Sequence, residues 1–261
     1  MKTHPRAAFT LIELLTVVAV LGVLGAVLLP ALGRCRAAAR SAREASAARV
    51  LMQAYLLVPQ DRRGELLPGS KNEAAFDEQG APLGTFSYRW PHRLAPYLGT
   101  RLLDTLFIND QARYYSEIRA TVPEQASYLF SLTPSFGLNL AHVGGITLGS
   151  GALDQRYGPV TQLEQCARPS RQLVFASAAN RLIAADAGYF EARSPTAANW
   201  PATLEAATSD TSRGWVDFRH GGRAVTAWLD GHVSREDYAA LLDMRLWAEP
   251  ARRADNPTWR P

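Results

Sequence analysis

The most regular hydrophobic pattern lies near the start of the chain, where charged residues are almost absent. Between Arg6 and Arg34 the only charged residue is Glu13, and 19 consecutive uncharged residues run from Leu14 to Leu32. At about 1.5 Å of rise per residue, a helix of this length matches the ~30 Å hydrocarbon core of a bilayer. The pattern therefore predicts a membrane-spanning helix.

Beyond this run the hydrophobic positions take up a helical period. From residue 47 they recur at i, i+3, i+4, i+7, i+8 and i+11, while three arginines share another face. Pro59 and the polar stretch after it end the pattern. The membrane helix should therefore continue as an amphipathic helix that has something to pack on. The apolar positions are Ala47, Val50, Leu51, Ala54, Tyr55 and Val58, and the arginines are Arg36, Arg40 and Arg43.

The bulk composition indicates a folded protein without a nucleic-acid or disulfide signature. Hydrophobic residues make up 47% and charged residues 20% of the 261 positions, which is ordinary for a globular chain. The formal charge of +4 comes from scattered arginines, so no specific nucleic-acid partner is predicted. Cys35 and Cys166 lie far apart in no metal-binding spacing, which favours two free thiols over one disulfide.

Three processing routes compete for the N-terminal segment. A secretory signal has an apolar core of about 7–15 residues and then a small-residue cleavage site, whereas this run is longer and is followed by arginines. A lipoprotein signal would need a small residue before Cys35, where this chain has Arg34. The third route fits best: a short basic leader with Lys2 and Arg6 is removed, and the apolar helix is retained.

The string FTLIELL directly after the leader resembles the processing site of type IV prepilins and type II secretion pseudopilins. The resemblance implies that prepilin peptidase cuts between Ala8 and Phe9, that the Phe9 amine is methylated, and that Glu13 is the retained acid. Pro30, the twenty-second residue from Phe9, matches a place where these helices commonly carry proline. The family normally has glycine before the cut, so Ala8 should slow cleavage without preventing it.

The position of Glu13 has a physical explanation that does not depend on the resemblance. A lone carboxylate in hydrocarbon costs at least a few kcal/mol, so it requires a proton, an interfacial position or a cation. Cleavage before Phe9 would create that cation one helical turn away, on the same chain or on a neighbouring subunit. The alternative is that Glu13 is a boundary charge at the headgroup level. Pro30 should bend or locally melt the helix near the far end of the span.

The resemblance implies an α+β, pilin-like fold, with a long N-terminal helix packed on a mainly antiparallel β-sheet head. It divides the chain into a leader (1–8), a helix (9–58, membrane-spanning to about residue 32) and a head (59–261). The protein would cross the inner membrane once, with its N-terminus cytoplasmic and its head periplasmic or extracellular. The excess of arginines between residues 34 and 49 favours the opposite orientation by the positive-inside rule. We give more weight to the processing motif.

The head contains several short patterns typical of strands and turns. They predict a strand with Phe86, Tyr88 and Trp90, and a helix from Pro91 to Gly99. They also predict a strand and a loop within residues 125–145, and two buried strands within 171–188. Residues 215–234 should form two strands around Gly221-Gly222 and a tight turn at Asp230-Gly231. A last helix should start at a cap formed by Ser234 with Asp237 and should end at Pro250.

Several head segments resemble large-headed pilin-like proteins abundant in planctomycete and verrucomicrobial bacteria. In that subset a His, nine residues and then Asp-Gly recur near the C-terminus, which here are His220, Asp230 and Gly231. The segments WPHRLAPYLG (90–99) and SFGLN (135–139) also resemble segments of that group.

The candidate ligands and catalytic residues of the head are few. A nine-residue strand is about 30 Å long, so His220 and Asp230 should shape two turns rather than bind one ion. Asp217, Asp230 and Asp237 could contribute to a calcium site, although no EF-hand ligand pattern is present, so no metal or cofactor is predicted. No nucleophile-elbow, P-loop, zincin or dinucleotide motif occurs, so no enzyme activity is predicted. His92 and His142 are expected to be exposed or capping, and the tryptophans at 90, 215, 228 and 247 to be core residues.

Together these patterns predict a structural subunit of a type IV pilus or a type II secretion pseudopilus. Its expected partners are like or related pilin subunits, prepilin peptidase, an inner-membrane assembly platform and membrane lipid. The alternative is a membrane-anchored periplasmic binding or hydrolytic domain that uses the pilin-like segment only for targeting.

Overall fold

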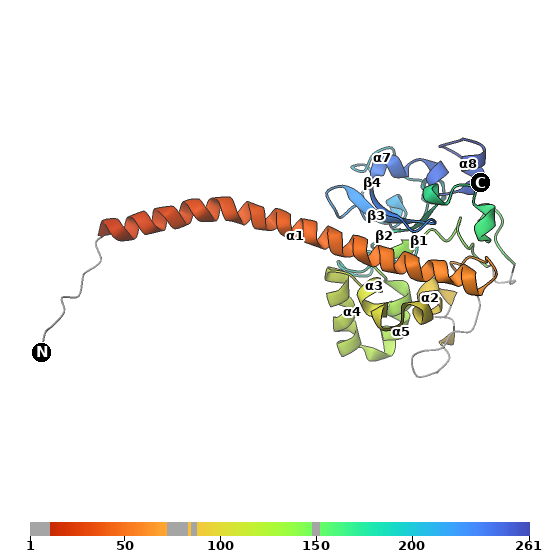
Figure 1. Cartoon of the computed structure of the whole chain (residues 1–261), viewed down its shortest axis with the longest axis horizontal. Helices are drawn as coiled ribbons and strands as arrows, with labels where there is room; N and C mark the ends of the chain where they lie inside the picture. The colour runs from red at the N-terminus through yellow and green to blue at the C-terminus, as the bar shows by residue number, and fades with distance from the viewer. Residues whose placement is uncertain (1–10, 72–82, 85–87, 148–151) are drawn as a thin grey trace, which may run out of the picture. The chain divides into compact units, whose positions relative to one another are not determined.

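The computed structural model of the chain describes residues 11–71, 83–84, 88–147 and 152–261 (Figure 1). The chain divides into two compact units, Met1–Ala42 and Arg43–Pro261. The described part of the first unit is helical throughout, and the second unit, called the head below, holds all the strands found in the described residues.

Helix α1 (Leu11–Asp61) is 51 residues long, and from Leu14 to Leu32 it is apolar on all sides. Its large hydrophobic side chains in the first unit are all solvent-exposed: Leu11, Ile12, Leu14, Leu15, Val17, Val18, Val20, Leu21, Val23, Leu24, Val27, Leu28, Leu29 and Leu32. Within the described part of the chain, α1 is the one helix long and apolar enough to cross a membrane. A helix that is hydrophobic all round requires an apolar surrounding, which agrees with a membrane-anchored protein.

The helix continues through Pro30 without interruption. Of the two effects predicted for Pro30, a bend or local melting of the helix, local melting does not occur. Proline removes one backbone N–H, and the hydrogen bonds of the turns on both sides are sufficient to keep the helix continuous.

Within the head, the last part of α1 is amphipathic as predicted. Of the six predicted apolar positions, five are buried and Val50 is partly buried; the buried ones are Ala47, Leu51, Ala54, Tyr55 and Val58. Arg43 is exposed. The period-3.6 pattern therefore identified the face of α1 that packs against the rest of the head.

A four-stranded antiparallel sheet lies at the centre of the head. Its strands β1 (Phe136–Leu138), β2 (Leu173–Ser177), β3 (Arg223–Trp228) and β4 (Val233–Asp237) are neighbours in chain order. Phe136 pairs with Ser177, Ala176 with Thr226, and Ala224 with Glu236. The long helix and the antiparallel sheet confirm the predicted α+β, pilin-like fold.

Strands β1, β2 and β3 are buried on both faces of the sheet, whereas β4 is partly exposed. Successive side chains of a strand point to opposite sides, so neighbouring residues enter different cores. Phe175 and Val225 belong to a core shared with α1, where Phe175 packs edge-on against Tyr55 with ring centroids 5.4 Å apart. Ala176 and Trp228 belong to a second core, shared with the C-terminal segments around Trp247. The sheet therefore separates α1 from the C-terminal region of the head (Figure 1).

Shorter helices complete the head. The segment between α1 and β1 holds α2 (Trp90–Leu98), α3 (Leu102–Leu106), α4 (Asp110–Thr121) and α5 (Pro123–Leu132). Helix α6 (Pro195–Ala198) precedes β3, and α7 (Tyr238–Leu241) and α8 (Glu249–Arg253) follow β4. Single 3-10 turns occur at Gly99–Arg101, Leu163–Gln165, Pro169–Arg171, Thr211–Arg213 and Met244–Leu246.

Three of the predicted head elements before the C-terminal region are confirmed. Helix α2 contains Pro91 near its start and is followed by Gly99, which has φ 52°. Strand β1 lies within residues 125–145, where one strand was predicted, and strand β2 lies within the first of the two apolar runs predicted as strands.

Two other predictions for this part are wrong, and one helix was not predicted. Trp90 begins a helix instead of ending a strand, and Phe86 lies outside the described residues. Helix α5 was not predicted, although Pro123 supplies a helix start. The second apolar run forms turns, and Leu182 in it is 79% exposed, so an apolar run alone did not specify a strand.

The C-terminal predictions are correct for strand β3 and for the tight turn at Asp230-Gly231, and wrong for the hairpin around Gly221-Gly222 and for the helix. Strand β3 follows Gly222 as expected and Gly231 has φ 95°, but the partner of β3 across the Asp230-Gly231 turn is β4, which was not predicted as a strand. The segment before Gly221 forms only an isolated bridge at Val216. The helix cap is Asp237, whose carboxylate accepts from the Ala240 N–H, because Ser234 still belongs to β4. Pro250 begins α8 instead of ending a helix.

Candidate functional site

The predicted processing and assembly residues lie in the first unit. Ala8 and Phe9 are outside the described residues. Glu13 is exposed in the first turn of α1, and its backbone carbonyl accepts a hydrogen bond of 3.0 Å from the Thr16 hydroxyl. Pro30 lies near the end of the apolar run. The structure therefore places Glu13 and Pro30 on one continuous helix.

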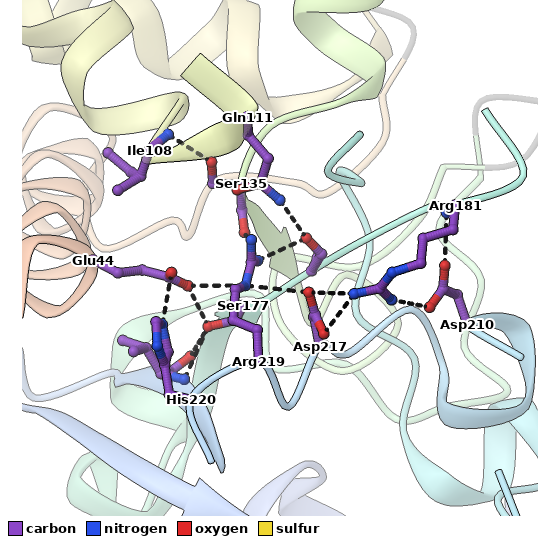
Figure 2. A network of polar contacts seen from close by, with 12 residues as sticks. Glu44, Ile108, Gln111, Ser135, Ser177, Arg181, Asp210, Asp217, Arg219 and His220 are labelled. Carbon is purple, nitrogen blue, oxygen red and sulfur yellow. Dashed lines mark hydrogen bonds and ion pairs between the residues drawn. The ribbon is translucent and has the colours of Figure 1, made fainter. Parts of the chain in front are cut away.

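A second polar site is centred on Glu44, a fully buried residue of α1 (Figure 2). Its Oε2 lies 2.8 Å from Nε2 of His220, and its Oε1 accepts a 2.6 Å hydrogen bond from the Ser177 hydroxyl. The Arg219 guanidinium lies 3.6 Å from Oε1. One carboxylate of α1 is therefore bound by side chains from β2 and from the segment before β3.

Arg219 extends this cluster through the head. Its Nε lies 3.2 Å from the Asp217 carboxylate, and its Nη2 donates to the carbonyls of Ser135 and Ala178. Asp217 in turn pairs with Arg181, 3.0 Å away. Figure 2 shows these groups as one connected network. Arg219 thus joins Glu44 to the backbone at the start of β1 and at the end of β2, which lie side by side.

The local sequence explains how these side chains reach Glu44. Ser177 is the last residue of β2, where its Oγ also accepts from the backbone N–H of Val225 on β3 at 2.9 Å. His220 directly precedes Gly221 and Gly222, which have φ 64° and 80°. Such angles suit glycine, so the chain can turn sharply after His220 and enter β3.

The charge state of Glu44 follows from its partners. Burial acts to raise the pKa of the Glu44 carboxyl. The charge of Arg219 and the hydrogen bonds from His220 and Ser177 outweigh burial and hold this pKa below its usual range. Glu44 is therefore an ionised, fully hydrogen-bonded carboxylate inside the head.

The other end of the motif formed by His220, Asp230 and Gly231 is held by a local contact and lies near α1. The Asp230 carboxylate lies 2.6 Å from Nδ1 of His232 and accepts the His232 backbone N–H. Burial acts to raise the pKa of Asp230, but the His232 contacts outweigh it and lower this pKa. A Cβ on Gly231 would lie 3.5 Å from Leu56 of α1. His220 therefore contacts α1 at Glu44, the turn at Gly231 lies near Leu56 of the same helix, and β3 lies between them.

The structure does not bring together the three aspartates considered for calcium. Asp217 faces Arg181 and Arg219, Asp230 faces His232, and Asp237 caps α7. Among residues 11–71, 83–84, 88–147 and 152–261, no group of three or more His, Cys, Asp or Glu side chains could hold a metal ion. The carboxylates thus serve as partners of cationic side chains and of one helix N-terminus.

The arrangement at Glu44 suits a structural clamp better than nucleophilic catalysis. Glu44 stands between the imidazole and the hydroxyl, so the order of contacts is His220, Glu44, Ser177. In a nucleophilic triad the imidazole contacts the hydroxyl directly. Glu44 and Ser177 are also fully buried, which leaves no path for a substrate.

His142 differs from its prediction, because it is fully buried and neither exposed nor capping. Its Nδ1 lies 3.0 Å from the Tyr157 carbonyl and its Nε2 lies 3.0 Å from the Ser194 hydroxyl. Burial lowers the pKa of His142 to about 4. Ser194 is fully buried as well, so the pair stabilises the interior. His92 is partly buried and contacts the Ser127 carbonyl.

The remaining predicted residues take structural positions. Trp90, Trp228 and Trp247 are buried as expected, and Trp215 is partly buried. Cys35 is exposed and Cys166 is buried, and both are free thiols.

The sequence analysis missed Glu44, although a signal was present. Glu44 lies three residues before Ala47 and seven before Leu51, so it continues the buried stripe of α1. An acid at a core position of an amphipathic helix requires a buried cationic partner. The partners could not be identified from spacing, because they lie more than 130 residues away.

Comparison with known proteins identifies the N-terminal segment. A family model described as the prokaryotic N-terminal methylation motif matches residues 3–29. No curated protein and no solved structure matches the chain. The match includes Ala8, Phe9 and Glu13. Together with the long apolar helix, it supports the interpretation of the chain as a membrane-anchored precursor similar to type IV pilins or pseudopilins.

Proposed function

We propose that the chain is a pilin-like structural subunit that assembles with other pilin subunits through α1 after prepilin peptidase removes residues 1–8. The observation that carries the proposal is the methylation motif at residues 3–29, which coincides with a helix whose apolar side chains are exposed on all sides. Such a helix needs lipid or other apolar helices around it. The protein performs no chemistry in this role.

In this mechanism Glu13 provides the specific contact between subunits. Cleavage before Phe9 creates an amine, and a carboxylate in an apolar surrounding gains most from pairing with a cation. The neighbouring subunit's amine supplies that cation in an array, while the leucines and valines of α1 pack laterally. Pro30 belongs to the same packing surface.

The Glu44 clamp supports the proposal from the side of the head. A subunit that is held in an assembly by its helix requires a head that stays attached to that helix. Glu44 is bound by His220, Ser177 and Arg219, and the Gly231 turn lies against Leu56. We propose this attachment as the role of the motif formed by His220, Asp230 and Gly231.

The finer assignments are part of the same proposal. The protein would be a single-pass inner-membrane protein with its head in the periplasm or in an extracellular filament, served by an inner-membrane assembly platform. A type II secretion pseudopilus and a type IV pilus are both compatible with the motif. The kinship of the head with the planctomycete and verrucomicrobial subset is likewise proposed, because the family match is limited to residues 3–29.

Mass spectrometry of the mature N-terminus tests the proposal. The chain is expressed in a host that contains prepilin peptidase, and the membrane fraction is analysed. The expected product begins at methylated Phe9. Ala8→Gly should be cut at least as fast as the wild type, whereas Ala8→Leu should accumulate as precursor. An intact Met1, or a cut near Ala39, would contradict the proposal.

A further inference from the structure

The end of the apolar run is marked by two closely spaced arginines. Arg34 and Arg36 lie two and four residues beyond Leu32 on α1, and both are exposed. At 1.5 Å per residue their Cα atoms are about 3 and 6 Å past the end of the apolar run. The polar headgroup layer extends roughly 5–7 Å beyond the hydrocarbon core on each side. If residues 14–32 fill that core, both arginines lie at the depth of the lipid phosphates.

The surroundings of the two arginines also favour a phosphate partner. From Leu14 to Ala42 the sequence holds no aspartate or glutamate, so this part of the chain offers no carboxylate to neutralise them. Their neighbours Gly33 and Cys35 are small, which leaves the guanidinium groups open to approach. A guanidinium group can form two parallel hydrogen bonds to a phosphate or to a carboxylate. Because this stretch of the helix has no carboxylate, a phosphate is the partner left to these arginines.

We propose that Arg34 and Arg36 bind the phosphate groups of anionic lipids in the leaflet where the apolar run ends. Residues two apart on a helix are separated by about 200°, so they do not face each other. Each arginine therefore takes its own headgroup, on opposite sides of α1. The two contacts fix how far α1 extends out of the bilayer. The positive-inside rule would place these arginines on the cytoplasmic side of the membrane, and the anionic headgroups provide the negative charge that stabilises them on the opposite side. The inference rests on the membrane-spanning part of the proposed function and not on cleavage or assembly.

Lipid selectivity in proteoliposomes tests this inference. The full-length protein is reconstituted in phosphatidylcholine bilayers that contain a trace of spin-labelled phosphatidylglycerol or spin-labelled phosphatidylcholine. The motionally restricted fraction of each label is measured by electron paramagnetic resonance. The variant is R34Q/R36Q, and the matched control is R101Q/R119Q, which removes the charge of two exposed arginines of the head. Near-UV circular dichroism checks that the head of each variant is folded.

The wild type and the control should both enrich phosphatidylglycerol over phosphatidylcholine, and R34Q/R36Q should reduce that enrichment at least about fivefold. Equal enrichment in the wild type and R34Q/R36Q would overturn the inference, and so would an equal loss in the control. The outcome is separate from that of the mass spectrometry. A precursor that is never cleaved still carries both arginines, and a methylated Phe9 without lipid selectivity would overturn only this inference.

Discussion

The imidazole Nε2 of His220 lies 2.8 Å from the carboxylate Oε2 of Glu44, a residue 176 positions earlier in the chain. The two residues belong to segments that the antiparallel sheet does not join by backbone hydrogen bonds, since Glu44 lies on α1 and His220 precedes β3. The contact therefore attaches the segment before β3 to α1, at a buried site where an unpaired charge would be strongly unfavourable.

Replacing Glu44 by glutamine should destabilise the head by about 3 kcal/mol, because the change removes a buried carboxylate that contacts His220 and Arg219. Arg219 is then left with the Asp217 carboxylate. The measurement is denaturant unfolding of the full-length protein in detergent, followed by tryptophan fluorescence. All six tryptophans lie in the head, so the signal reports its unfolding.

The exposed Glu117→Gln is the matched control for Glu44→Gln, and it should change stability by less than about 1 kcal/mol. A double-mutant cycle with His220→Gln isolates the pair, and a coupling free energy well above zero is expected. Additive effects of the two substitutions would show that the Glu44–His220 contact does not hold the head to α1.

The free energy of unfolding of the head should decrease as the pH is lowered, in two pH ranges that belong to His142 and to Glu44. The pKa of His142 is lowered to about 4 in the folded head from an ordinary 6.5, so the unfolded state binds more protons between these values. Stability is then complete above about pH 6.5 and decreases by roughly 3 kcal/mol as the pH falls to about 4. The pKa of Glu44 is also lowered, so its contribution is present above the usual glutamate pKa and is lost as the pH falls through the folded value.

Two variants separate these pH ranges in pH-dependent unfolding experiments. His142→Asn should be less stable at pH 8 but should lose most of the decrease between pH 6.5 and 4. Glu44→Gln should keep that decrease and should have a smaller dependence below about pH 4.5. An unchanged slope between pH 6.5 and 4 in His142→Asn would exclude this residue as the origin of the decrease in the higher pH range.

The parts of the fold that were predictable from the sequence are those with local, periodic signals. The apolar stripe of α1, strand β3 and the tight turn at Asp230-Gly231 were recognisable, because their hydrophobic period and turn residues act within a few positions. The run around Leu182 carried the same apolar signal as β2, yet it lies in turns at the surface. Whether an apolar run pairs with a sheet depends on neighbours that the run itself does not encode.

The candidate site was predictable only at its N-terminal end. Ala8, Phe9 and Glu13 lie within one short motif, so a local pattern was enough to find them. The Glu44 clamp depends on Ser177 and His220, which tertiary folding alone brings to α1. His220 was singled out from its spacing to Asp230, but its partner proved to be Glu44, because β3 holds the two ends of the motif apart.

Gly137, within the SFGLN segment, should not tolerate a side chain. A Cβ at this position would lie 2.5 Å from the backbone C and O of Glu191, which pairs with β1 through Leu138. Both partners are backbone, so neither can move aside without disturbing the sheet edge. Gly137→Ala should therefore lower the free energy of unfolding by about 2 kcal/mol or more, as measured by denaturant unfolding.

Gly33→Ala is the control for Gly137→Ala, because Gly33 lies in α1 with nothing within 4 Å of an added Cβ. This substitution should be neutral or slightly stabilising. If Gly137→Ala behaves like Gly33→Ala, the close packing of Glu191 on β1 is not needed for the stability of the head.

Glu13→Leu should abolish self-association and leave the head folded. The substitution removes the anion that the proposed mechanism pairs with a neighbouring Phe9 amine, while it adds an apolar side chain that the membrane tolerates well. The measurement is co-purification of an untagged copy with a tagged copy from detergent-solubilised membranes, with tryptophan fluorescence of the head as the folding check. Glu13→Asp retains the carboxylate and should keep part of the association.

The comparison of the two variants also separates the two functional hypotheses. A domain that uses its N-terminal helix only as an anchor depends on hydrophobicity, and Glu13→Leu increases hydrophobicity. The membrane attachment of such a domain would then be unchanged or stronger, and its co-purification with a second copy would be unchanged. A subunit that assembles through a buried ion pair loses its partner in Glu13→Leu, even though it remains in the membrane. Undiminished co-purification of Glu13→Leu would therefore contradict the assembly mechanism and favour a helix that serves only to anchor the head.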